Sequence, residues 1–217
     1  MTSPFTLYGD AGTGSVLVEA ALTLLDLAYD RVDVPDLDQP AAGAAFGKVN
    51  PMRQVPALVL PSGQLMTESA AILIWLADSH PASGLSPALD GAERPAFLRW
   101  MAFVSASIYS LYWIRDDPSR LAADARSQAV VKARTMDRIL VCWRMMEAQV
   151  SPGRYILGEA LTVLDLYVTV ISRWGPRRRR FGDVAPHLAE VVRRVDADPR
   201  LGTLWAERFP FGAGWEG

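Results

Sequence analysis

The chain has 217 residues, of which 50% are hydrophobic and 21% charged, a composition typical of a globular protein with one large or two small domains. Its formal net charge of −2 gives no general attraction to nucleic acid or to an anionic membrane surface. A single cysteine, Cys142, excludes an intramolecular disulfide framework and a cysteine-based zinc cluster, and two histidines argue against a His-rich metal site. We therefore expect no metal and no nucleic-acid partner.

The N-terminal segment has no features of a secretory signal, because its first basic residue is Arg31. The longest unbroken apolar run, Ala70–Ala77, is much shorter than the roughly 18 residues that suggest a membrane span. We expect a cytoplasmic protein with no membrane partner.

The first eighty residues alternate between strand and helix patterns. In chain order these are a strand at 5–9, a buried helix at 15–29, a strand at 29–34, a weak helix at 39–50, a hairpin at 57–66 and a helix at 67–80. The hairpin is indicated by "PSG", a turn sequence between "ALVL" and "GQLM". The order β-α-β-α-β-β-α predicts a small α/β domain with helices covering a four-stranded sheet.

From residue 81 the pattern changes, because prolines and glycines cluster in "PASGLSPALDGAERP" and the following segments are helical. Helices are predicted at 96–117, 123–150, 162–174, 184–199 and 200–209. The segment "TVLDLYVTVISRW" is apolar on almost all sides, which favours a buried position in a helical bundle. The predicted domains are 1–80, a linker at 81–90 and an all-helical domain at 91–217.

The stretch "RQVPALVL" places Pro56 directly before a short apolar strand. Proline cannot donate to a strand ladder, so the simple interpretation is a strand start. If the Val55–Pro56 bond is cis, the Val55 backbone groups instead face outward and can pair with an extended peptide.

A second feature is "TESAAI", where Thr67, Glu68 and Ser69 start a helix directly after a strand. A hydroxyl that caps the helix is the simple interpretation. The alternative is a ligand site, because free N–H groups and the positive helix end attract a carboxylate while Glu68 can pair with an ammonium group. An α-amino acid head group fits this trio.

The third feature is "YGDAGTGSV", which joins the first strand to the first helix. Thr13 and Ser15 are hydroxyls at the helix start, Tyr8 ends the strand, and helix capping is again the alternative to a ligand role. The glycines do not match the dinucleotide pattern G-x-G-x-x-G, because Gly12 and Gly14 are followed by Leu17.

Together these segments resemble the glutathione S-transferase superfamily. "NPMRQVPAL" followed by "GQLMTESAAILIWLAD" is similar to its glutathione-binding signature, and "YGDAGTGSVLVEAAL" is similar to its first strand and helix. "LTVLDLYVTVISRW" resembles a helix of its second domain, opened by a capping box of Thr162 and Asp165. The resemblance covers nearly the whole chain and implies a thioredoxin-like domain before an all-helical one.

The resemblance also implies how glutathione, the expected cosubstrate, is bound. Val55 would pair its backbone with the cysteinyl unit, next to a cis Pro56, and Glu68 with Ser69 would hold the γ-glutamyl head group. Gln54 is placed near the glycyl end. Arg53 stands where the family usually has glycine, and it either adds a charge near the glycyl carboxylate or points to solvent.

The residue that activates the thiol is expected near the first helix, because a hydrogen-bond donor there stabilises the reactive thiolate. Cysteine-type members of the family have Cys where this chain has Gly14, which argues against mixed-disulfide chemistry. Against members that read "YGDxxSGN", Thr13 replaces the serine and Ser15 the asparagine. Our order of candidates is Thr13, then Ser15, then Tyr8.

In the helical half, Tyr109, Tyr112 and Trp113 are spaced to share one side of a helix, in the region that borders the electrophile pocket in this family. Core packing or a dimer face is the alternative for them. The four arginines of "RWGPRRRRF", 177–180, are predicted to form a solvated loop, with an anionic ligand as the alternative.

The expected function is a glutathione transferase, in which the bound thiolate attacks a small hydrophobic electrophile. Conjugation, isomerisation, reductive dehalogenation and ether cleavage would all use that thiolate. The alternative is a non-catalytic glutathione-binding or regulatory protein of the same fold. A homodimer is expected from the resemblance.

Overall fold

The computed structural model describes residues 4–35, 37, 40–175 and 177–210. The described residues form two compact units. The first contains the residues up to Ser86 together with those from Asp196 onward, and the second contains Pro87–Val195. Consequently helix α10 (Gly202–Arg208), predicted from sequence as the last element of the helical half, belongs to the first unit. The binding roles expected for segments 1–80 and 91–217 remain predictions.

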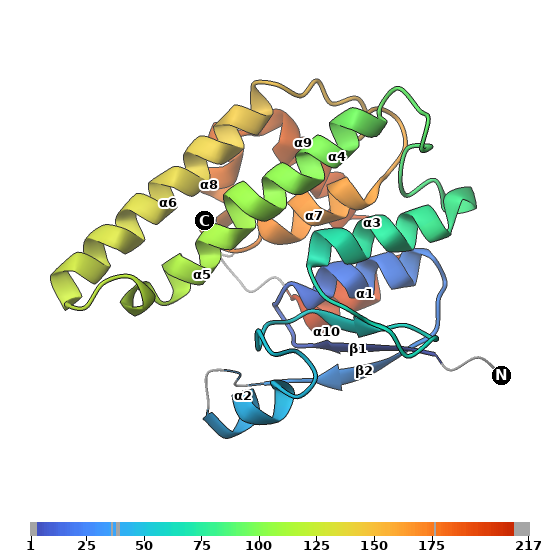
Figure 1. The fold of residues 1–217 in the computed structure, drawn as a ribbon. Helices are drawn as coiled ribbons and strands as arrows, with labels where there is room; N and C mark the ends of the chain where they lie inside the picture. Colours follow the sequence, from blue (N-terminus) through green and yellow to red (C-terminus); the bar gives the residue numbers. More distant parts are fainter. Residues whose placement is uncertain (1–3, 36, 38–39, 176, 211–217) are drawn as a thin grey trace. The chain divides into compact units, whose positions relative to one another are not determined.

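The first unit is built on a four-stranded mixed sheet (Figure 1). Its strands, in the order β2-β1-β3-β4, are β1 (Phe5–Gly9), β2 (Tyr29–Asp33), β3 (Ala57–Val59) and β4 (Leu65–Met66). β1 runs parallel to β2 and antiparallel to β3, and β3 is antiparallel to β4. Four helices belong to the same unit, namely α1 (Ser15–Leu24), α2 (Pro40–Phe46), α3 (Ser69–Ser79) and α10.

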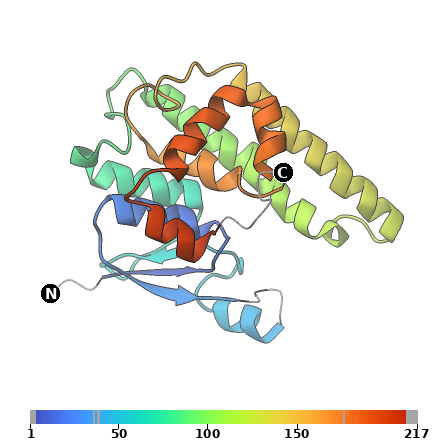
Figure 2. The same ribbon diagram turned by 180° about the vertical axis from the view of Figure 1, so that it is seen from behind.

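The alternation of side chains along β1 explains how the sheet is covered. Phe5 on one face is buried and its ring lies 6.4 Å from that of Trp75 in α3. Tyr8 on the other face packs against Phe46 of α2, with 5.8 Å between the ring centroids. α1 and α3 also contact each other, and α10 lies against α1 (Figures 1 and 2). The predicted thioredoxin-like α/β arrangement is therefore confirmed.

The second unit is entirely helical. Its longer elements are α4 (Arg94–Phe103), α5 (Ser110–Asp116), α6 (Ala125–Glu147), α7 (Val163–Ile171), α8 (Arg177–Val184) and α9 (Pro186–Asp196). Short 3₁₀ turns lie at Pro81–Ser83, in the first unit, and at Pro118–Arg120. Every residue of α7 is buried, as the apolar sequence of this segment predicts.

Two features of the second unit differ from the sequence prediction. The helix predicted at 96–117 contains a π-helical turn, Val104–Tyr109, between α4 and α5. The arginines at 177–180, predicted as a solvated loop, begin helix α8. Arg178 is buried there and donates from Nη2 to the carbonyl of Thr169 at 2.9 Å, because the last carbonyls of α7 need donors.

The predicted capping box opens α7. The Asp165 carboxylate accepts from the Thr162 N–H at 2.7 Å, from the Thr162 hydroxyl at 2.9 Å and from the Ile156 N–H at 2.8 Å. Asp165 is fully buried, and this burial raises its pKa to about 6 although the three hydrogen bonds act in the opposite direction. The folded protein therefore holds a proton on Asp165 over a pH range in which the unfolded chain has lost it.

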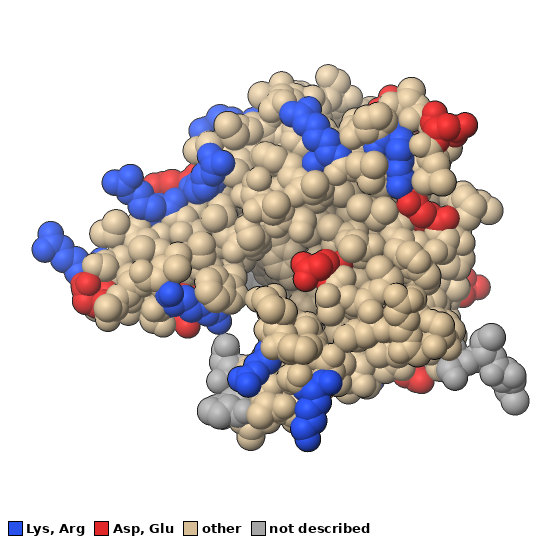
Figure 3. Space-filling model, viewed as in Figure 1, with Lys and Arg blue, Asp and Glu red and all other residues tan. Residues whose placement is uncertain are grey.

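Along the described residues, no helix combines the length and apolar character that a membrane crossing requires. The same residues contain no group of three or more His, Cys, Asp or Glu side chains placed to hold a metal ion. On the face seen in Figure 3, Lys and Arg side chains lie in separate places over α6, α4 and the region of α2 rather than in one patch.

The raised pKa of Asp165 predicts a pH dependence of stability. Between about pH 4 and pH 6 the folded state binds more protons at this site than the unfolded state, so its contribution to the free energy of unfolding falls as the pH rises. Relative to Asp165→Asn, which does not titrate, the wild type should lose about 2 kcal/mol from pH 4 to pH 7.

Urea denaturation of both proteins at unit pH steps measures this difference. Glu190→Gln, on the exposed face of α9, controls for the loss of one carboxyl group. A wild-type advantage that grows with pH would contradict the prediction.

Candidate functional site

The register of the sheet brings the three sequence features of the first unit to one place. Tyr8 of β1 pairs with Ala57 of β3, so the loop that follows β1 lies beside the residues that precede β3. Leu58 of β3 pairs with Met66 of β4, so the start of α3 lies on the other side of those residues. The β1–α1 loop, the Val55–Pro56 bond and the N-terminus of α3 therefore meet at the same end of the sheet.

A set of hydrogen bonds around Asp10 organises the β1–α1 loop. The hydroxyls of Thr13 and Ser15 donate to the Asp10 carbonyl at 2.7 and 3.0 Å, and the two hydroxyl oxygens lie 3.0 Å apart. The Asp10 N–H donates back to these oxygens, at 3.4 Å for Thr13 and 3.1 Å for Ser15. Ser15 is fully buried, whereas Thr13 is partly exposed. Of the two, only the Thr13 hydroxyl lies where an incoming ligand can reach it.

Gly9 allows this loop to close against α1. A Cβ atom at position 9 would lie 2.1 Å from the Cβ of Ser15 and 2.2 Å from its Oγ. A side chain at position 9 would therefore displace Ser15 and the hydroxyl bonds that it makes.

Tyr8, the third candidate for thiol activation, occupies a different position. It lies within β1 rather than in the loop, and its ring packs against Phe46 on the α2 side of the sheet. Because side chains alternate along a strand, this is the face opposite to Leu7, which is completely buried.

The Val55–Pro56 peptide bond is cis, and Pro56 is buried while Val55 is partly exposed. Among the described residues, no hydrogen bond joins the backbone amide or carbonyl of Val55 to another group. Asn50 was not identified as a site residue from the sequence. Its side chain holds the turn that precedes Val55, because its Nδ2 donates to the Gln54 carbonyl at 2.7 Å and its Oδ1 accepts from the Met52 N–H at 3.1 Å. Buried asparagine next to a proline-containing turn is the signal that could have identified it.

Gln54 and Arg53 are both exposed beside Val55. Arg53 has a φ of +53°, in the left-handed region that favours glycine. Its side chain runs along α2, where a Cβ added at Gly47 would lie 3.4 Å from the Arg53 Nε. Arg53 is therefore exposed and lies near the end of α2.

The start of α3 differs from ordinary hydroxyl capping. Glu68 is the N-cap residue, and no side-chain hydrogen bond caps this helix in the described structure. Glu68 is exposed and has a φ of +64° with a ψ of 100°, a conformation rarely adopted by residues other than glycine. Ser69, the first residue of α3, is buried. This unusual backbone places the start of α3 at the end of the sheet described above.

The aromatic residues proposed for the electrophile pocket have separate environments in the second unit. Tyr112 is buried, its hydroxyl donates to the Ile171 carbonyl at 3.3 Å, and its ring lies 5.1 Å from that of Trp174. Tyr109 is partly exposed and also contacts Trp174 at 5.1 Å. Trp113 is 46% exposed and is covered on one side by the guanidinium of Arg120. The structure therefore places Tyr112 in the core, while Tyr109 and Trp113 retain accessible surface.

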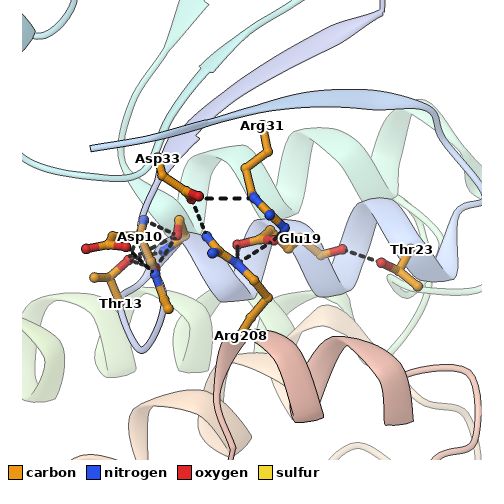
Figure 4. Close-up of polar contacts among 9 residues, drawn as sticks. Asp10, Thr13, Glu19, Thr23, Arg31, Asp33 and Arg208 are labelled. Atoms are coloured by element: carbon orange, nitrogen blue, oxygen red, sulfur yellow. Dashed lines mark hydrogen bonds and ion pairs between the residues drawn. The ribbon is translucent and has the colours of Figure 1, made fainter. Parts of the chain in front are cut away.

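A buried cluster of charges beside the β1–α1 loop was not identified from the sequence (Figure 4). Arg208 of α10 donates from Nε to both carboxylate oxygens of Glu19, at 3.0 Å each, and from Nη2 to Oδ1 of Asp33 at 2.9 Å. Glu19 of α1 is fully buried, and this burial raises its pKa against the opposing effect of Arg208. Nearly two hundred residues separate the partners, so no local spacing pattern reveals the pair.

The close approach of Gly9 and Ser15 predicts that Gly9→Ala destabilises the protein by about 3 kcal/mol, because the new methyl group overlaps the Ser15 side chain. Urea denaturation measures the loss, with Gly202→Ala as a control, since a Cβ at position 202 meets nothing within 4 Å. The cost of Gly9→Ala should fall in a Ser15→Gly background and persist in a Ser15→Ala background, which keeps the Cβ. An equal cost in all three backgrounds would contradict the packing account.

Comparison with known proteins agrees with this geometry. The family model "Glutathione S-transferase, N-terminal domain" matches residues 17–79. An uncharacterized GST-like protein of Escherichia coli, YncG, is 34% identical over 196 residues, covering 90% of this chain and 94% of that protein. Glutathione S-transferase GST-4.5 of Xanthomonas campestris is 32% identical over 172 residues, covering 77% and 81% of the two chains. A sphingomonad glutathione S-transferase, solved in complex with glutathione, superposes with a TM-score of 0.76 at 27% identity, covering 94% of this chain and 100% of that one. The similarity over nearly the full length, in sequence and in fold, shows that this chain belongs to the glutathione S-transferase superfamily.

Proposed function

We propose that this protein is a glutathione transferase, which binds glutathione at the end of its sheet and activates the thiol for attack on a small hydrophobic electrophile. The observation that carries the proposal is the convergence of the β1–α1 loop, the Val55 backbone and the start of α3, fixed by the pairing of β1, β3 and β4. A sphingomonad relative with the same fold was solved with glutathione bound, which supports this ligand.

Each part of the site offers chemistry that matches one part of the tripeptide. Glu68 can pair with the α-ammonium of the γ-glutamyl group, while the Ser69 hydroxyl and the N–H groups at the start of α3 can donate to its carboxylate. The Val55 amide and carbonyl can form a short two-hydrogen-bond pairing with the cysteinyl backbone. Gln54 and Arg53 are exposed on the far side of Val55, where they can meet the glycyl carboxylate.

Thr13 is the first candidate for activating the thiol. Its hydroxyl is partly exposed and currently donates to the Asp10 carbonyl, which the Ser15 hydroxyl also reaches. Because Ser15 can keep that carbonyl satisfied, Thr13 can turn its proton toward a sulfur atom without leaving a part-buried acceptor unpaired. A donor hydrogen bond and the positive end of α1 both stabilise a thiolate over a thiol. In this scheme Ser15 keeps the Asp10 carbonyl hydrogen bonded while Thr13 turns, and Tyr8 is the third candidate for thiol activation.

The remaining parts of the proposal concern the electrophile and the assembly. We propose that Tyr109 and Trp113, which keep accessible aromatic surface, contact a hydrophobic substrate. Tyr112 is buried against Trp174 and supports this region from the core. Conjugation is the proposed reaction. A cytoplasmic homodimer is proposed by analogy with the family.

One observation favours a second function, that of a non-catalytic glutathione-binding protein. Both hydroxyls of the loop donate to a single backbone carbonyl, so neither points a free proton at a ligand in this structure. If Thr13 does not turn, glutathione would bind without activation of its thiol.

The thiol-activation step can be tested with Thr13→Val, which keeps the shape of the side chain and removes its hydroxyl. We expect the rate of conjugation of an aryl halide to fall about a hundredfold, with a smaller change in glutathione affinity, because one stabilising donor is lost. Thiolate absorbance of bound glutathione as a function of pH should show a higher thiol pKa in the variant than in the wild type. Ser15→Ala and Tyr8→Phe rank the other hydroxyls. Full activity of Thr13→Val would show that a group other than the Thr13 hydroxyl activates the thiol.

The head-group role can be tested with Ser69→Ala and Glu68→Gln by isothermal titration with glutathione. Each variant should bind at least tenfold more weakly, because a charge-assisted hydrogen bond to the γ-glutamyl group is lost. S-methylglutathione, which keeps the head group but has no thiol, should show the same losses. Unchanged affinity in both variants would contradict the assignment of this end of α3.

A further inference from the structure

We propose that Arg208 is a positioning residue for the thiol-activating loop, acting through Glu19, Asp33 and the backbone of Gly12. Arg208 lies close to the C-terminal end of the described chain, and none of the glutathione contacts proposed above involves it. The proposed catalytic role of Arg208 rests on the proposed function, whereas its hold on the loop does not.

The side chain of Arg208 joins α1, which follows the loop, to β2, the strand paired with β1. Its guanidinium, with only 6% of the side chain exposed, binds Glu19 on α1 and Asp33 at the end of β2. β2 is itself tied to β1 next to the loop, because the Val34 N–H donates to the Gly9 carbonyl at 2.8 Å. One guanidinium therefore fixes the spacing between α1 and the strand end from which the loop departs (Figure 4).

The backbone of Arg208 contacts the loop directly. Its carbonyl accepts from the N–H of Gly12 at 2.8 Å. Gly12 has a φ of +71° and lies immediately before Thr13, so this bond holds the turn that presents the Thr13 hydroxyl. The position of the carbonyl depends on the side chain, because Arg208 is the last residue of α10 and its guanidinium anchors that end of the helix.

The charges around Arg208 are balanced, which lets the cluster stay buried. Arg31 on β2 lies 3.8 Å from a Glu19 oxygen and 3.4 Å from Asp33, so two carboxylates alternate with two guanidiniums. Arg31 is 39% exposed at its side chain, whereas Arg208 is enclosed. Removal of Arg208 would leave the Glu19 carboxylate without the Nε–H that donates to both of its oxygens, and α1 would have to shift or admit water.

The direct test is hydrogen exchange of the full-length protein, followed at residues 10–14 in the wild type, Arg208→Met and Arg208→Lys. We expect exchange of the loop amides to speed up about tenfold or more in Arg208→Met, and less in Arg208→Lys, whose single ammonium can reach one carboxylate but not both. Arg200→Met removes an ion pair with Asp198 ahead of α10 without touching Glu19, and it should leave the loop unchanged. Loop exchange equal to the wild type in Arg208→Met would overturn the proposal.

The catalytic consequence is measured in the same variants. In Arg208→Met, conjugation should slow about ten- to a hundredfold and the thiol pKa of bound glutathione should rise, while the KM for glutathione changes little. A purely structural role would lower stability but leave the thiol pKa of the folded protein unchanged, and that result would overturn the catalytic part. If the wild type itself fails to bind glutathione, the proposed function is wrong, and the exchange experiment still decides whether Arg208 holds the loop.

A second variant covers the case in which Arg208→Met does not fold. The pair Glu19→Gln with Arg208→Gln removes both buried charges and keeps groups that can hydrogen bond, so no uncompensated charge is left inside. Faster loop exchange in this double variant would support the proposal, because the link to Asp33 is weakened. Unchanged exchange would overturn it.

Discussion

The pairing of β1 with β3 is the constraint on which the site depends. A strand pair has one register, and Tyr8 opposite Ala57 sets which residues meet beyond the end of the sheet. A shift by one residue would turn Phe5 and Leu7 away from α1 and α3 and would expose their apolar surface, so the core itself enforces the register. The same pairing then places the β1–α1 loop beside Val55 and, through β4, beside the start of α3. The register that buries the core residues is thus the same register that brings the segments of the site together.

Inside the loop, function and folding use the same hydrogen bonds. The Asp10 carbonyl accepts from two hydroxyls and from the Thr13 N–H, so it stays satisfied if one hydroxyl turns away. Such redundancy permits the Thr13 hydroxyl to exchange its partner, because the part-buried carbonyl keeps Ser15. Gly9 is a requirement of this arrangement, since the loop can close on Ser15 only where no side chain intervenes. The conformations of Arg53 and Glu68, both with positive φ, show that the backbone on the opposite side of the site is also unusual.

The charge cluster shows how a distant segment enters the first unit. A carboxylate as buried as that of Glu19 is costly unless it is paired and hydrogen bonded, and Arg208 supplies both interactions. The apolar residues of α10, including the buried Leu204 and Trp205, give the helix its general affinity for the unit. The ion pair selects one placement among the many that apolar contact alone would allow, and that placement brings a backbone carbonyl to Gly12.

The sequence by itself determined the order of the elements, the α/β and helical halves and the capping box of α7, because each follows from local periodicity or from a short motif. The resemblance of its segments around Val55, Glu68 and Thr13 to the glutathione S-transferase family was the basis for proposing glutathione and the side chains around it. Three matters were decided only by the tertiary structure: the helix at the four arginines, the core position of Tyr112, and the pairing of Glu19 with Arg208. Each depends on a partner in another element, such as the Thr169 carbonyl of α7 for Arg178 and the Ile171 carbonyl of α7 for Tyr112. Burial and long-range hydrogen bonds are properties of the folded chain, and local sequence patterns do not encode which distant residue will supply them.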